Sequence, residues 1–297
     1  MKTKRDRLLY LHYLPSMTRR YLYKIKKTDP EWQHIFSHTP QELSTLLQLP
    51  IHKAVTLYKE IQNTTYYLSQ LQHNLRRMKT VTIYDKIYPD ILKNIPDSPL
   101  ILYVLGDTSL LNQQKSISVI GTRKPSSEAF SKLQHIVAPL LEDEWSVVSG
   151  LAYGIDSMAH RLTLKADRKT IAVLGSGFFH IYPKPHLALC KEIAKHGLVL
   201  SEYPPYKRPQ KYFFPERNRI ISGLSQATLV IEAMERSGTL ITVDQALDQG
   251  KEVYAIPGSP LMPQTKGCLR MIQDGAKAVI DSTDILEDWT SFSVKNR

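Results

Sequence analysis

Residues 116–126 read Ser-Ile-Ser-Val-Ile-Gly-Thr-Arg-Lys-Pro-Ser, a short apolar run that ends at a glycine followed by hydroxyls and cations. Six similar runs follow along the chain, separated by helical stretches of about 10–15 residues. Several runs are too apolar to alternate, which is typical of parallel strands covered on both faces. The pattern predicts a doubly wound α/β sheet. The seven runs are Ile117–Ile120, Ser146–Ser149, Thr170–Leu174, Leu198–Ser201, Ala227–Ile231, Glu252–Ile256 and Ala278–Ile280.

The first third of the chain has no glycine, since all 13 glycines lie between Gly106 and Gly275. Residues 39–42, Thr-Pro-Gln-Glu, have the form of a capping box with proline at the first helical position. Apolar residues then recur every three or four positions from Ile51 to Leu75, which predicts one long helix. We therefore predict a small all-helical domain over residues 1–80.

Prolines and other turn residues indicate the remaining domain boundaries. Residues 81–113 contain several prolines and are predicted to be a connector that ends in a short strand at Leu100–Leu105. The sheet domain is expected over residues 114–290. A chain of 297 residues is long enough for about two domains.

Composition limits the classes of function. Two cysteines, Cys190 and Cys268, cannot build a disulfide framework or a four-cysteine zinc site. The chain shows no signal peptide and no uncharged apolar run of about 18 residues, so a cytoplasmic protein outside the membrane is expected. Residues 1–80 hold 14 Lys/Arg against 5 Asp/Glu, whereas the remaining residues hold 25 against 23. A basic first third on a nearly neutral body favours a polyanionic partner.

The ends of the predicted strands carry residues suited to anions. In a doubly wound sheet, ligands bind where the carboxyl ends of the strands lead into loops. The first loop, Gly121-Thr122-Arg123 with Ser126, offers backbone N–H groups, hydroxyls and a guanidinium that can grip a phosphate. An ordinary tight turn with a solvent-facing arginine is the structural alternative.

The second loop contains Gly150 and Gly154, which allow close backbone approach. Asp156 and His160 stand four residues apart and so could form an acid–base pair or part of a metal site. Two candidate ligands do not make a site. We expect instead that Asp156 caps the next helix and that His160 packs near it.

The third loop, with Gly175 and Gly177, resembles the start of a dinucleotide-binding turn, but His180 occupies the place of the third glycine. Glu202, at the end of the next predicted strand, lies in a Tyr-Pro-Pro turn and is a poor ligand for a ribose. A nicotinamide cofactor is therefore not expected. The sequence has no Gly-x-x-x-x-Gly-Lys-Ser/Thr motif either, which argues against a P-loop NTPase.

The fourth and fifth loops complete the set of candidate anion sites. Residues 213–219, Phe-Phe-Pro-Glu-Arg-Asn-Arg, combine aromatic rings and cations at a helix start, which suits unstacked bases and the phosphates between them. The aromatic rings could equally belong to the core. The fifth strand leads into a hydroxyl-rich helix start. The candidate residues in these two loops are Phe214, Arg217, Asn218, Arg219, Ser237, Gly238 and Thr239.

From about Tyr84 to Asp281 the chain resembles the DprA/Smf (DNA processing protein A) family. The segments that carry the resemblance are VIGTRKPS, VVSGLAYGIDSMAH, IAVLGSGFFHIYP, LSEYPP, FPERNRIISGLS, VIEAMERSGTLITVDQAL, VYAIPGSP and GCLRMIQDGA. The resemblance implies an extended Rossmann-like fold preceded by a SAM-like helical domain. Many members carry a C-terminal winged helix, and the few residues after Asp281 leave no room for one.

The resemblance also implies a function. Such a protein binds single-stranded DNA, helps load RecA recombinase during natural transformation, forms a homodimer, and has no enzymatic activity, cofactor or metal. The family pattern points to Arg123 and Lys184 as DNA contacts, and to one of Arg217 and Arg219 as a phosphate ligand with the other supporting the loop. Rings available for stacking on bases, at about 1–3 kcal/mol each, are Phe178, Phe179, Tyr182 and Phe214.

Two other classes of protein remain as alternatives. The sheet and the Ser237-Gly238-Thr239 turn are also similar to the lysine-decarboxylase-like (LOG) nucleotide phosphoribohydrolases. Their catalytic carboxylate is missing after Thr239, and only Glu232 or Asp244 could replace it. A pure protein adaptor is the second alternative, but it would not need several phosphate-type turns at one edge of the sheet.

Overall fold

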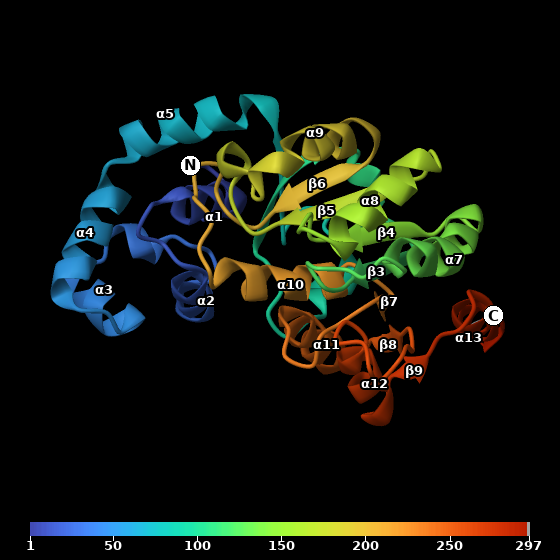
Figure 1. The fold of residues 1–297 in the computed structure, drawn as a ribbon. Coiled ribbons are helices and arrows are strands. Elements are labelled where there is room, and N and C mark those ends of the chain that lie inside the picture. Colours follow the sequence, from blue (N-terminus) through green and yellow to red (C-terminus); the bar gives the residue numbers. More distant parts are fainter. Residues whose placement is uncertain (296–297) are drawn as a thin grey trace. The chain divides into compact units, whose positions relative to one another are not determined.

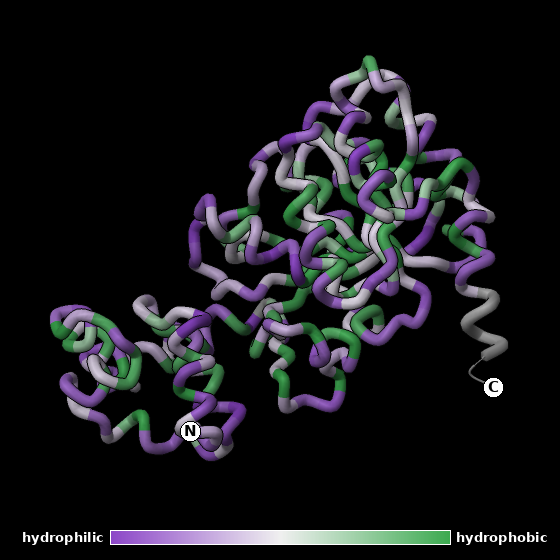
Figure 2. Tube along the Cα trace, turned by 90° about the horizontal axis from the view of Figure 1, so that it is seen from below, coloured by the Kyte–Doolittle hydropathy of each residue, from purple (hydrophilic) through white to green (hydrophobic). Residues whose placement is uncertain are grey.

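The structure, a computed structural model, describes residues 1–295 and consists of two compact units (Figure 1). The first unit spans residues 1–85 and the second begins at Lys86. No helix in the described range is long and apolar enough to cross a membrane. Figure 2 shows that hydrophobic segments concentrate in the interior of the larger unit, with hydrophilic segments towards its outside.

The first unit is helical. Thr39 and Glu42 form the predicted capping box, with the Thr39 hydroxyl accepting from the Glu42 N–H and the Glu42 carboxylate from the Thr39 N–H. Trp32 is fully buried, and its indole N–H donates to the Tyr84 hydroxyl at 2.8 Å. The elements of this unit are α1 (Lys4–Tyr13), α2 (Arg19–Thr28), η1 (His34–Phe36), α3 (Pro40–Leu47), α4 (Ile51–Gln62), α5 (Thr64–Asn74), η2 (Leu75–Arg77) and β1 (Lys79–Thr82).

The single long helix predicted from Ile51 to Leu75 is wrong in one respect. Asn63, with φ −83° and ψ 55°, leaves the helical region and divides the segment into α4 and α5. The buried face of α4 is formed by Ala54, Leu57 and Ile61. The apolar spacing from Ile51 onwards therefore predicted only part of the helix face that packs inward. Several different apolar stripes satisfy a spacing of three or four, and tertiary packing selects one of them.

The second unit is built on a sheet with the strand order β2-β6-β5-β4-β3-β7-β8-β9. Strands β3 to β9 are parallel, and β2 pairs antiparallel with β6. The predicted runs coincide with strands to within one residue at each end, apart from Ile280, which lies two residues beyond the end of β9. The strands are β2 (Ile101–Gly106), β3 (Ser116–Ile120), β4 (Ser146–Ser149), β5 (Thr170–Leu174), β6 (Leu198–Ser201), β7 (Ala227–Val230), β8 (Glu252–Ala255) and β9 (Lys277–Ala278).

The helices cover both faces of this sheet, with α7, α8 and α9 on one face and α10 and α11 on the other (Figure 1). The chain first winds from β3 to β6 and then returns to β7, which lies on the other side of β3. Because crossovers between parallel strands are right-handed, the helices of the two halves cover opposite faces of the sheet. The helices of this unit are α6 (Asp90–Lys93), η3 (Thr108–Asn112), α7 (Ala129–Glu142), α8 (Ile155–Lys165), η4 (Phe178–His180), η5 (Lys184–His186), α9 (Leu187–His196), α10 (Phe213–Gly223), α11 (Gly238–Asp248), α12 (Lys266–Gln273) and α13 (Thr283–Lys295).

The doubly wound α/β sheet is thus confirmed, and its topology locates a ligand crevice. Strand order reverses between β3 and β7, which pair in parallel with Ile117 beside Ala227. In open α/β sheets ligands bind outside the carboxyl ends of the strands at such a switch point. The loops that follow β3 and β7 therefore border the crevice.

Candidate nucleic-acid interface

A pocket of about 760 Å³ opens at this switch point. Its walls come from the β3–α7 loop, the β7–α11 loop and the first turns of α10, so it joins segments more than 100 residues apart. The predicted site residues that line it are Gly121, Thr122, Arg123, Phe214, Arg217, Asn218, Ser237, Gly238 and Thr239.

The β3–α7 loop is held from below by Glu232, which follows β7. The Thr122 N–H donates to the Glu232 carbonyl at 2.7 Å. The fully buried Glu232 carboxylate accepts from the Ser126 N–H at 2.9 Å, from the Ser126 hydroxyl at 2.5 Å and from Lys132 Nζ at 3.0 Å. Ser126 therefore braces the loop and does not line the pocket. The loop's cations, Arg123 and Lys124, are left exposed on the pocket wall.

Arg123 lies in a cluster with the aromatic rings of Phe214 and Tyr182. Its guanidinium carbon lies 5.9 Å from the centre of the Phe214 ring, within the range of a cation–π contact. The Tyr182 ring, 44% exposed, lies 5.5 Å from Phe214. Of the other rings considered, Phe178 packs against the hydrophobic core, whereas Phe179 is 54% exposed and does not line the pocket.

Arg217 is buried beneath this group and ties two strand ends together. One guanidinium nitrogen donates to the Gly150 carbonyl after β4 at 2.6 Å and also to the Val173 carbonyl in β5. Burial lowers the pKa of the Arg217 guanidinium to about 10, and the neighbouring Arg123 contributes in the same direction. A cation kept charged in this position makes the pocket floor electropositive.

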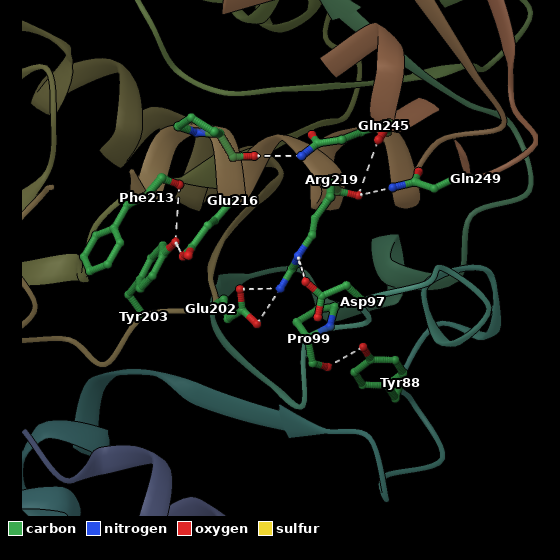
Figure 3. Close-up of polar contacts among 12 residues, drawn as sticks. Tyr88, Asp97, Pro99, Glu202, Tyr203, Phe213, Glu216, Arg219, Gln245 and Gln249 are labelled. Carbon is green, nitrogen blue, oxygen red and sulfur yellow. Dashed lines mark hydrogen bonds and ion pairs between the residues drawn. The ribbon is translucent and has the colours of Figure 1, made fainter. Parts of the chain in front are cut away.

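Arg219, two residues further along α10, faces a different partner. Its guanidinium nitrogen lies 2.7 Å from both carboxylate oxygens of Glu202, and Asp97 lies 3.4 Å away (Figure 3). Both members of the Arg219–Glu202 pair are at most 5% exposed. Arg219 does not line the pocket.

Helix α10 is fixed by further contacts, as Figure 3 shows. The Tyr203 hydroxyl lies 2.9 Å from the Glu216 carboxylate. The side-chain amides of Gln245 in α11 and of Gln249, directly after it, donate to the carbonyls of Pro215 and Arg219 at 3.0 and 2.9 Å. The helix that carries Phe214, Arg217 and Asn218 is therefore held rigidly beside the strand ends.

The remaining wall is the start of α11. Ser237 is the N-cap residue, but its hydroxyl makes no capping hydrogen bond and its oxygen is buried without a partner. A side chain added at Gly238 would meet nothing within 4 Å. The open first turn of a helix carries unsatisfied N–H groups and a partial positive charge, so this wall also favours an anion.

Five of the other predicted residues lie outside the large pocket. Gly154, with φ +75°, lets α8 begin against the Thr122 carbonyl, where a Cβ would come within 2.3 Å. Gly175 makes room for the Phe214 ring, and Gly177 packs against the carbonyl of Pro204. Lys184 is exposed at the start of η5, next to the pocket residue Tyr182. Gly150 lines a small adjoining hollow.

Several residues that line the pocket were missing from the predicted site, among them Lys211, Met234 and Ile241. Lys211 lines the wall beside Phe214, and Met234 and Ile241 contribute apolar surface. A signal for Lys211 was available, because it lies in the cationic loop before α10. Nothing in the pattern distinguished Met234 or Ile241 from ordinary core residues.

The expectation that Asp156 caps α8 is wrong. The N-cap position is Gly154, and the buried Asp156 carboxylate accepts from the N–H groups of Gly150 and Ala152 at 3.1 and 3.4 Å. Burial raises the pKa of the Asp156 carboxyl. His160 is fully buried, and its Nδ1 lies 2.7 Å from the Thr170 hydroxyl. Within residues 1–295 no three His, Cys, Asp or Glu side chains are grouped to hold a metal ion.

His160 is expected to make stability depend on pH. Burial lowers its pKa in the folded protein to about 3, against 6.5 in the unfolded chain. Below pH 6.5 the unfolded state therefore takes up a proton that the folded state does not, and the free energy of unfolding falls by up to about 1.4 kcal/mol per pH unit. Urea unfolding of the wild type and His160→Asn at about pH 7.5 and about pH 5 measures this. An equal fall in both proteins would contradict the prediction.

The doubly wound sheet and its pocket define a Rossmann-like protein with a cationic and aromatic pocket at the topological switch point. The chain belongs to the family of DNA recombination-mediator protein A, whose model matches residues 79–290. The DNA processing protein DprA of Bacillus subtilis is 42% identical over 92% of this chain and 91% of its own length. The DprA of Streptococcus pneumoniae is 41% identical over 74% of this chain and 78% of its own.

Solved structures agree with this assignment. The crystal structure of DprA from Streptococcus pneumoniae aligns with a TM-score of 0.81 and 33% identity, covering 97% of this chain and 98% of that one. A structure of DNA processing protein A from Helicobacter pylori, described for its single-stranded DNA binding mode, aligns with a TM-score of 0.65 and 26% identity. That alignment covers 72% of this chain and 96% of the other.

Proposed function

We propose that this protein binds single-stranded DNA in the switch-point pocket, without reading its base sequence. The observation that carries the proposal is the Arg123 guanidinium lying over the Phe214 ring and beside Tyr182, at the mouth of a pocket whose far wall is the start of a helix. Cations beside exposed rings suit a strand whose phosphates and unstacked bases must be held together.

The exposed and the buried cations of the site have different roles. Arg123, Lys124 and Lys211 are exposed and line the pocket, so they contact backbone phosphates. The helix start at Ser237–Thr239 receives a further phosphate. Arg217 and Arg219 are buried and hold α10 in place, with Arg217 adding positive charge from beneath. Stacking and phosphate contacts carry no sequence information, so base preference is weak.

We further propose that the bound strand is passed to RecA recombinase in the cytoplasm during natural transformation or DNA processing, and that the protein acts as a homodimer without catalysing a reaction. Membership in the recombination-mediator family supports this role. Such a mediator needs to hold the strand by its backbone and to release it, and exposed cations at an open pocket allow both. The basic helical unit would speed the approach of DNA at low salt.

A nucleotide hydrolase of the LOG type is the less favoured alternative. Hydrolysis of an N-glycosidic bond needs a carboxyl group that can exchange a proton with the substrate. The Glu232 carboxylate is fully buried and is occupied by the Ser126 N–H, the Ser126 hydroxyl and Lys132. Asp244 is exposed on α11 and does not line the pocket.

Fluorescence anisotropy with labelled oligothymidine and with a duplex of equal length, at several salt concentrations, tests the proposal. We expect tighter binding to the single strand and a log-linear loss of affinity with salt, with a slope of about −0.7 for each phosphate neutralised. Equal binding to both DNAs, or none to either, would refute the proposal and make a nucleotide panel the next assay. A positive result leads to an assay of RecA filament formation on the bound strand.

A further inference from the structure

Tyr153 stands at the tip of the loop between β4 and α8, the loop formed by residues 150–154. Its ring is 42% exposed, although the residues on both sides of it in the chain are wholly or partly buried. The loop follows directly from the sheet edge at which the switch-point pocket opens.

The loop that carries Tyr153 is rigid and strained. Leu151 has a left-handed backbone with φ 59°, a conformation that costs a side-chain-bearing residue about 1 kcal/mol or more. Arg217 binds the Gly150 carbonyl, and the buried Asp156 carboxylate binds the N–H groups of Gly150 and Ala152. Two buried charged side chains thus hold in place a short loop whose exposed tip is a single aromatic residue.

The ring itself is also fixed. Tyr153 contacts His186 edge to face, with ring centres 5.1 Å apart and an interplanar angle of 65°. His186 is buried, and its Nδ1 lies 2.9 Å from the Leu151 carbonyl of the same loop. An aromatic ring that is already ordered loses little conformational entropy when a second flat surface packs on it.

The surroundings of Tyr153 indicate what that surface is. A small hollow adjoining the large pocket is lined by Tyr153, Tyr182 and Phe214, with Arg123 among them and Arg217 beneath. Exposed rings and an exposed guanidinium share one hollow at the mouth of the pocket. The hollow itself, at about 10 Å³, has room for about one water molecule. The ring faces and the guanidinium at its rim therefore suit a nucleotide that lies over the hollow, with its flat base stacked on a ring and its anionic phosphate at Arg123.

We propose that Tyr153 is a base-stacking platform that holds one nucleotide of the single strand, with the adjacent phosphate at Arg123. This inference rests on the proposed function and adds a contact to it. The strand then passes from the hollow at Tyr153 into the large pocket, so the rigid β4–α8 loop becomes part of the DNA-binding surface.

The test compares Tyr153→Ala and Tyr153→Trp with the wild type, using oligothymidine anisotropy at several salt concentrations. Tyr153→Ala is expected to weaken binding about 5- to 150-fold, the loss that accompanies removal of one stacked ring. The salt slope should stay unchanged, because no phosphate contact is removed. Tyr153→Trp should bind at least as tightly as the wild type. Phe130→Ala is the matched control, since Phe130 is also 42% exposed but lies on α7 outside the site.

A strand with abasic sugars in place of every thymidine provides a second readout, the ratio of two affinities measured on the same protein, which does not change with the fraction of the variant that is folded. Removing the bases should weaken binding to the wild type more than binding to Tyr153→Ala, because the variant has lost one of the stacking partners. Equal ratios for the two proteins, or unchanged affinity in Tyr153→Ala, would overturn the inference. Absence of wild-type binding to oligothymidine would refute the proposed function itself, so the two failures are distinguishable.

Discussion

Replacing Arg219 with methionine is expected to lower the free energy of unfolding by about 3–5 kcal/mol. The substitution leaves the Glu202 carboxylate, 4% exposed, without the guanidinium that lies 2.7 Å from both of its oxygens. A buried charge without its counter-charge is among the costliest defects in a folded protein. Because Arg219 lies on α10, loss of the pair also loosens the helix that positions Phe214 and Arg217.

Urea unfolding followed by circular dichroism measures this change, and two variants control it. Glu202→Gln combined with Arg219→Met removes both charges and should recover most of the lost stability. Arg161→Met removes an exposed arginine from α8 and should change the free energy of unfolding by less than about 0.5 kcal/mol. If Arg219→Met is as stable as Arg161→Met, the buried pair is not what holds α10.

Replacing Arg123 with alanine is expected to weaken binding to single-stranded DNA about 10- to 100-fold, as suits the loss of a charged hydrogen bond to phosphate. The salt slope should become shallower by about 0.7–1, because one phosphate contact is lost. The fold should be unaffected, since Arg123 is exposed and its only ring contact, among those resolved in the structure, is the one with Phe214.

Two lysine variants separate a site contact from a general effect of charge. Lys195→Ala removes an exposed cation from the last turn of α9, at the opposite edge of the sheet, and should leave affinity nearly unchanged. Lys184→Ala should have an effect smaller than that of Arg123→Ala, because Lys184 lies next to the pocket rim without lining it. If Arg123→Ala and Lys195→Ala bind alike at every salt concentration, the pocket is not where the strand binds.

Arg217 and Arg219 have different partners in the structure, and the sequence alone could not predict this difference. Both were candidates for a phosphate ligand, and the segment alone could not separate them. Two residues apart on a helix, they point about 200° away from each other. One therefore reaches the carbonyls of Gly150 and Val173, and the other reaches Glu202. Neither direction can be assigned until the position of α10 against the sheet is known.

The strands were predictable for a local reason. Each is a short apolar run bounded by turn residues, and a parallel strand buried on both faces needs little else. That several of the loops after these strands meet at one edge of the sheet was predictable as well, because parallel strands end together. The break at Asn63 and the capping role assigned to Asp156 were predicted wrongly, because helix spacing and capping preference allow more than one outcome and packing decides between them.

The sequence by itself determined the fold class, the order of strands and helices along the chain, and which loops follow the carboxyl ends of the parallel strands. These properties depend on periodicity and on turn chemistry within about 15 residues, where chain connectivity restricts the possible partners. Only the tertiary structure decided which cations are exposed, which are buried as braces, and that Tyr153 shares a hollow with Arg123 and Phe214. Those properties depend on contacts that no local pattern encodes, because the residues are far apart in the chain: 17 positions for Arg219 with Glu202, 67 for Arg217 with Gly150 and 91 for Arg123 with Phe214.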